Sequence, residues 1–218
     1  MGVHMRIGLK ALVTVPALLA AVAVATPAQA APIALSEGHV DVVDVAYEGG
    51  QLEIAIHDEE TDTEYEPSDV LLVVKKESAT PVPTDPAFSF LGAPGATVYV
   101  LPDTETEGLL FPGLAAEEVE PGVFLDDQVT IRFKQVVGPD GVSLFGYHPD
   151  GSPNKRVDSE DGLPDGIVLG AGAHAHTNWA FEKAGKYWIK VDATAKLAST
   201  GATVTSPATW LTFRVDKN

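Results

Sequence analysis

The tripeptide His174-Ala175-His176, directly before the strand-like run Asn178–Phe181, carries the residue types best suited to chemistry in this chain. In a β-strand, residues two apart point to the same face and lie about 6.6 Å apart along the strand. Two imidazoles so placed can turn their ring nitrogens onto one ion, and neutral imidazole is the commonest metal ligand. The alternative is an exposed pair at the start of a strand, so the positions of the other histidines become decisive.

Two further histidines flank a predicted β-hairpin whose turn is Gly49-Gly50. In perfect register His39 and His57 would point to opposite faces of this hairpin, because side chains alternate along a strand. The alternation of apolar residues slips at Val42-Val43, which predicts a β-bulge there. One extra residue at that point turns His39 and Asp41 to the face that His57 occupies.

The pair at 174 and 176 is expected on an outward face as well. Trp179 and Phe181 favour the core, and strand alternation then sends Asn178, His176 and His174 to the other face. The sequence therefore predicts one metal site with four ligands: His39, His57, His174 and His176. Nitrogen ligands favour Zn²⁺, with Cu²⁺ or Mn²⁺ as alternatives. Whether His148 or carboxylates join the site is left open.

The elements that must position these histidines read as short strands separated by turn signals, which predicts an all-β, immunoglobulin-like β-sandwich. Tyr187, after Gly185-Lys186, resembles the corner tyrosine of such sandwiches. A long irregular middle segment spans residues 77–122, with one clear strand at 97–101 and one helical turn at 114–119. The other predicted strands are 40–47, 52–56, 70–74, 129–133, 142–147, 178–181, 187–195 and 210–215.

Residues 1–30 have the pattern of a secretory signal peptide. Arg6 and Lys10 precede an apolar run, and Ala28-Gln29-Ala30 predicts cleavage before Ala31. An uncleaved membrane anchor is the alternative. Residues 31–218 are expected to form a single secreted β-sandwich domain without a membrane span, free or associated with the cell surface.

The composition of the chain limits both its partners and the groups that can bind a metal. After residue 30 the chain has 12 basic and 31 acidic residues, a net charge of −19, which disfavours nucleic acid and anionic membranes as partners. The chain contains no Cys, and both of its methionines, Met1 and Met5, lie within the first 30 residues. Any metal in the mature chain must therefore bind to histidine, carboxylate or carbonyl groups.

Three segments resemble the actinobacterial surface-anchored repeat family (choice-of-anchor M type domains): Gly38-His39-Val40-Asp41, the hairpin end Ile56-His57-Asp58, and the block His174–Phe181, followed by Ala184-Gly185-Lys186-Tyr187. This resemblance implies an extracellular setting beside metal-type ABC uptake transporters. The implied partners are a metal ion and an ABC-transporter substrate-binding protein or a cell-surface component. The chain differs from many members in lacking a C-terminal anchor motif.

Together these observations predict an extracytoplasmic metal-binding protein that supports ABC-transporter metal uptake or buffers the metal. The alternative is a non-catalytic adhesion or interaction module, in which Trp188 is exposed at a contact surface.

An acidic segment at 158–165 could wrap Ca²⁺ but does not match the EF-hand pattern, so a solvated loop is expected. An enzyme is not expected, since neither a Gly-x-Ser-x-Gly nor a His-Glu-x-x-His motif is present.

Overall fold

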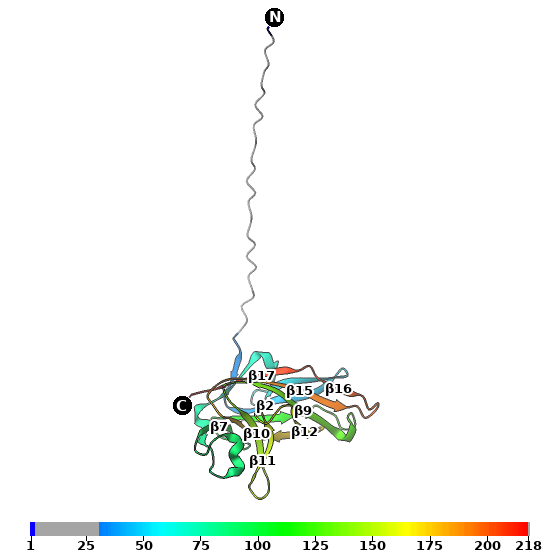
Figure 1. The fold of residues 1–218 in the computed structure, drawn as a ribbon. Helices are drawn as coiled ribbons and strands as arrows, with labels where there is room; N and C mark the ends of the chain where they lie inside the picture. The colour runs from blue at the N-terminus through cyan, green and yellow to red at the C-terminus, as the bar shows by residue number, and fades with distance from the viewer. Residues whose placement is uncertain (3–30, 218) are drawn as a thin grey trace. The chain divides into compact units, whose positions relative to one another are not determined.

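The computed structural model describes residues 1–2 and 31–217, and the predicted signal peptide falls almost entirely on residues 3–30, outside the described part. Residues 31–218 form one compact unit, and Figure 1 labels several of its strands. No helix among the described residues is both long and apolar enough to cross a membrane.

The unit is all-β, as predicted, and its strands form three sheets. The first sheet has the order β1 (Ile33–Leu35), β5 (Val70–Val74), β17 (Thr209–Val215), β15 (Gly185–Lys196), β9 (Gln128–Val137) and β12 (Asp165–Gly170), with β16 (Thr203–Thr205) added to β15. The second has the order β11 (Pro153–Asp158), β10 (Val142–Tyr147), β14 (Asn178–Phe181), β7 (Thr97–Leu101) and β6 (Ala79–Pro81). The third has the order β13 (His174–His176), β8 (Leu110–Ala115), β2 (Gly38–Glu48), β3 (Gln51–Asp58) and β4 (Thr63–Tyr65).

Buried apolar side chains from all three sheets meet in one core, which gives the unit a sandwich-like arrangement. Ile131 of the first sheet, Leu144 of the second and Val45 of the third belong to this core, together with Trp179 and Phe181. The four short 3-10 helices are η1 (Pro67–Asp69), η2 (Lys76–Ser78), η3 (Pro86–Leu91) and η4 (Leu125–Asp127).

The other face of the second sheet is covered by the η3 segment, whose Phe88 and Phe90 pack against Phe145. This cover buries Asn178, so the expectation that Asn178 shares an outward face with the histidines is wrong. Asn178 instead donates a hydrogen bond to the Phe145 carbonyl and accepts one from the Asp103 amide.

The predicted hairpin and its bulge are both confirmed. Near the Gly49-Gly50 turn, β2 and β3 pair in the predicted register, with Asp44 opposite Ala55. Beyond Val42-Val43 the register shifts by one residue, which places Asp41 directly opposite His57. Residues directly opposite in an antiparallel pair share a face, so the bulge turns Asp41 toward the side of the sheet that carries His57.

The middle segment is more regular than its composition suggests. The strand at Thr97–Leu101 is confirmed. The turn predicted at 114–119 is shorter than expected: residues up to Ala115 belong to strand β8, and a single turn follows, in which the Val119 amide donates to the Ala116 carbonyl. This strand contains Pro112 and Gly113. Both residue types are depleted in strand interiors, so the sequence pattern does not indicate a strand here. Strand β11 was likewise not among the predicted strands.

Tyr187 makes the corner contact expected of it. Its hydroxyl donates to the Lys183 carbonyl at 2.8 Å and accepts a hydrogen bond from the Lys183 amide at 3.3 Å. Its ring is buried and packs edge-on against Phe181. The contact fixes the start of β15 to the loop that follows β14.

Candidate metal centre

Three neighbouring strands of the third sheet place the candidate residues on one face. The central strand, β8, pairs with β2 on one side and with β13 on the other. Gly113 lies between Asp41 of β2 and His176 of β13. Alternation along each strand then brings His39 and His174 to the same face as these residues, while the residues between them turn to the core.

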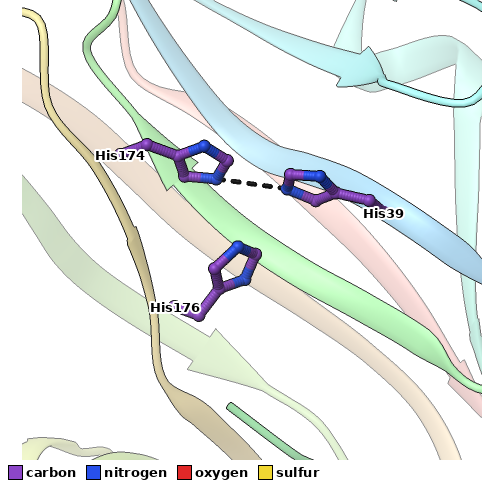
Figure 2. A group of neighbouring side chains, drawn as sticks. All are labelled: His39, His174 and His176. Atoms are coloured by element: carbon purple, nitrogen blue, oxygen red, sulfur yellow. Dashed lines mark hydrogen bonds between the residues drawn. The ribbon is translucent and has the colours of Figure 1, made fainter. Parts of the chain in front are cut away.

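His39, His174 and His176, called the histidine triad from here on, converge over β8 (Figure 2). The Nε2 atoms of His39 and His174 lie 3.2 Å apart. The centroid of the His176 ring lies 4.8 Å from that of His39 and 4.7 Å from that of His174. Two nitrogen ligands of one tetrahedral Zn²⁺ lie about 3.3 Å apart, so the His39–His174 spacing suits a shared ion.

The tautomer of His176 is fixed by the backbone. Its Nδ1 lies 3.1 Å from the carbonyl oxygen of Pro112, which can only accept a hydrogen bond. Nδ1 must therefore carry the proton, and the lone pair lies on Nε2. The His176 ring also stacks on Phe111 at a centroid distance of 3.6 Å. A hydrogen bond from the distal nitrogen to a backbone carbonyl is the usual way in which proteins orient a metal-binding histidine.

Asp41 adds a carboxylate to the histidine triad. Its side chain is only 1% exposed, and its Oδ1 lies 2.8 Å from His174 Nε2 and 3.4 Å from His39 Nε2. Neither carboxylate oxygen accepts a well-aligned hydrogen bond from the described residues. A buried carboxylate without such bonds is costly unless a cation or proton compensates it. Asp41 is thus placed to add one oxygen donor to the three imidazole nitrogens.

Gly113 provides the space in which these groups meet. A Cβ atom at this position would lie 2.6 Å from His174 Nε2 and would collide with Asp41 Oδ1. Real Cβ atoms essentially never approach other atoms this closely, so any larger residue would displace both groups. The glycine is required here for space rather than for backbone conformation.

Burial favours the neutral forms of His39 and His176, and acidic side chains lie near the site. Burial lowers the pKa of His176 to about 4, and burial together with His174 lowers the pKa of His39. Both side chains therefore stay unprotonated near neutral pH, as metal ligation requires. The surrounding carboxylates that act on His39 are Glu59, Glu105 and Glu117.

His57, the fourth predicted ligand, is not part of the histidine triad. It lies on β3, which is separated from β13 by both β2 and β8. Three strand spacings amount to about 14 Å, too far for His57 and His176 to share one ion. His57 instead lies with Asp41 and Glu59, and its Nδ1 is 3.2 Å from Glu59 Oε1.

The remaining residues singled out in the sequence lie away from the histidine triad. His148 is exposed after β10 and belongs to no group of potential metal ligands among the described residues. Trp188 is 38% exposed, as predicted, on the outer face of the first sheet. In the acidic segment at 158–165, Asp158 accepts hydrogen bonds from the Glu160 amide and from the Lys155 ammonium group, so its carboxylate already has partners.

The site includes residues that the sequence did not assign as ligands or supports. Asp41 had been placed on the correct face by the bulge, but its burial could not be seen from the pattern. Phe111 and Gly113 were not predicted to contribute to the site, because strand β8, which carries them, was not predicted. The Gly38-His39-Val40-Asp41 segment, with its alternating polar residues, was the one signal that could have indicated Asp41.

Neither a scan against protein-family models nor a search of curated proteins finds a match for this chain. The resemblance to the actinobacterial surface-anchored family therefore stays a prediction.

Proposed function

We propose that this protein binds a transition-metal ion through the Nε2 atoms of His39, His174 and His176, with Asp41 as the fourth donor. The observation that carries this proposal is the convergence of three imidazoles from two separate strands onto a position left open by Gly113. Two of these histidines have pKa values lowered by burial, and the cluster surrounds a buried carboxylate, so it offers unprotonated nitrogen donors beside a negative charge.

The donor set favours zinc. Three imidazole nitrogens and one carboxylate oxygen form a borderline-soft, four-coordinate set that suits Zn²⁺, whereas Mn²⁺ prefers more oxygen ligands. Cu²⁺ also binds imidazole strongly and is the main competitor. The proposed role is extracytoplasmic capture or buffering of the ion for an ABC-type uptake system, in keeping with the signal-peptide pattern and the family resemblance.

Calorimetric titration of the metal-free unit, residues 31–218, with Zn²⁺, Cu²⁺ and Mn²⁺ tests the proposal. We expect tight Zn²⁺ binding that is lost in the His174→Ala/His176→Ala double variant. His148→Ala is the matched control, because His148 is exposed and distant from the triad in sequence and strand position. Binding that is unchanged in the double variant, or no binding by the intact protein, would contradict the proposal.

A second candidate function, an interaction module, is favoured by the outer face of the first sheet. Trp188, Trp210 and Val137 line one surface pocket there. Lys186 Nζ lies 5.4 Å from the centre of the Trp188 ring, and Lys190 Nζ lies 5.4 Å from that of Trp210. Two indoles with adjacent ammonium groups form a local aromatic and positively charged surface, in contrast to the net negative charge of the chain. Such a surface suits an anionic polysaccharide: sugar faces stack on the rings and acidic groups pair with the lysines.

Affinity electrophoresis in gels that contain a polyuronate tests this second candidate. We expect retardation of the intact unit and its loss in the Trp188→Ala/Trp210→Ala variant, with His174→Ala/His176→Ala as the control that still binds. Equal mobility of the intact unit and the tryptophan variant would exclude this ligand class.

A further inference from the structure

A second group of potential ligands adjoins the histidine triad on the same sheet. It consists of Asp41, His57 and Glu59, each of which offers a ligand atom within 4.8 Å of the others. We call it the carboxylate–histidine cluster. Asp41 and His57 face each other across the β2–β3 pair, directly below the bulge. The Glu59 amide donates to the His39 carbonyl, which ties this residue to β2.

Each of the two ring nitrogens of His57 faces a carboxylate oxygen. Nδ1 lies 3.2 Å from Glu59 Oε1, and Nε2 lies 3.3 Å from Asp62 Oδ1. In the tautomer that carries its proton on Nε2, the Nε2–H group donates a hydrogen bond to Asp62, and the Nδ1 lone pair is directed toward Glu59 and can bind a cation. A carboxylate behind a histidine is the common arrangement that fixes its tautomer and raises its basicity as a ligand.

Asp41 belongs to both groups, and it is an independent indication of a ligand. Its side chain is almost fully buried, and neither of its two oxygens accepts a well-aligned hydrogen bond from the described residues. One carboxylate can bind two ions through its two oxygens, and bridging carboxylates are typical of sites with two metal ions. Asp41 lies on the strand between the one that carries His57 and the central strand β8.

We propose that the protein binds a second divalent cation in the carboxylate–histidine cluster, with Asp41 bridging the two ions. This inference rests on the proposed function for its first ion, but it adds a site that the histidine triad does not contain. One nitrogen and several carboxylate oxygens make a harder donor set than the triad, which suits Zn²⁺ or Mn²⁺. The second ion is expected to bind more weakly, since Asp62 and Glu59 lie nearer to solvent.

Metal stoichiometry tests this inference. The unit 31–218 is equilibrated with excess Zn²⁺, freed of unbound metal by rapid gel filtration and analysed for zinc per chain. We expect two Zn²⁺ per intact chain, one in His57→Ala/Glu59→Gln, and two in the control Glu60→Gln, which changes an exposed carboxylate of the same loop. With Cu²⁺ as the probe, electron paramagnetic resonance should show coupling between two ions in the intact chain alone.

The outcomes separate the second site from the proposed function. One Zn²⁺ per chain, unchanged in His57→Ala/Glu59→Gln and lost in His174→Ala/His176→Ala, would overturn the second site and leave the histidine triad in place. No bound Zn²⁺ in the intact chain would overturn both. Two ions without magnetic coupling of the Cu²⁺ form would overturn the bridging role of Asp41.

Discussion

At the scale of single residues, the candidate site depends on the missing side chain of a glycine as much as on its potential ligands. Gly113 has no side chain, and for this reason two groups from β2 and β13 can meet above β8. Phe111, two residues earlier on the same face, supports the His176 ring by stacking. A small residue and an aromatic residue on the central strand thus shape a site whose donors all come from the strands beside it.

Replacement of Gly113 by Ala should therefore impair metal binding. The added Cβ would force His174 and Asp41 apart, and we expect Zn²⁺ affinity to fall about 10- to 100-fold, as for other losses of ligand orientation. Overpacking should also lower stability by about 1–3 kcal/mol. Titration calorimetry and urea unfolding measure the two effects.

Gly146→Ala is the control for this variant, because a Cβ there meets no atom within 4 Å and its backbone is not left-handed. Wild-type Zn²⁺ affinity in Gly113→Ala would show that the position above β8 is not the metal site.

At the scale of elements, the strands with clear alternation were predicted from the sequence and the strand that matters most to the site was not. The β2–β3 hairpin follows from two alternating runs and a Gly-Gly turn, and the bulge follows from a slip in phase. Strand β8 could not be predicted because Pro112 and Gly113 interrupt its pattern, and only tertiary pairing with β2 and β13 makes it a strand. His57 was misassigned to the triad because the sequence does not reveal how many strands separate it from β13.

The Tyr187 corner provides a prediction at this scale. Tyr187→Phe removes the hydroxyl that bonds to both the carbonyl and the amide of Lys183, and we expect a loss of about 1–2 kcal/mol in the free energy of unfolding. Because the corner lies on β15, outside the sheet that carries the triad, Zn²⁺ affinity should not change. Urea unfolding is the measurement.

Tyr147→Phe serves as the comparison, since Tyr147 is exposed and its hydroxyl forms no hydrogen bond among the described residues. Equal stability of the two tyrosine variants would show that the corner contact does not stabilise the fold.

At the scale of the whole molecule, a strongly acidic chain contains carboxyl groups whose ionisation opposes folding. Glu182 is an example away from the candidate metal centre. Burial and the neighbouring Glu160 raise its pKa to about 7, and its Oε1 has no hydrogen-bond partner among the described residues. The folded protein therefore binds more protons than the unfolded chain between about pH 4.5 and 7, and it loses stability as the pH rises through this range.

Glu182→Gln should remove this part of the pH dependence. We expect the variant to be more stable than the wild type at pH 8, by an amount on the order of 1 kcal/mol once solvent screening of this partly exposed group is allowed for. At pH 4.5 the difference should vanish. Thermal unfolding at both pH values tests this expectation, with Glu77→Gln as an exposed control. An equal gain at both pH values would contradict the ionisation argument.

The central claim, that three histidines bind one ion, is tested most directly by NMR of the imidazole nitrogens before and after one equivalent of Zn²⁺. The Nε2 resonances of His39, His174 and His176 should all move to metal-bound positions, while Nδ1 of His176 keeps its proton through the Pro112 carbonyl. Both nitrogens of His148 should stay unchanged. If Zn²⁺ leaves the three Nε2 resonances where they are, the histidine triad is not a metal site.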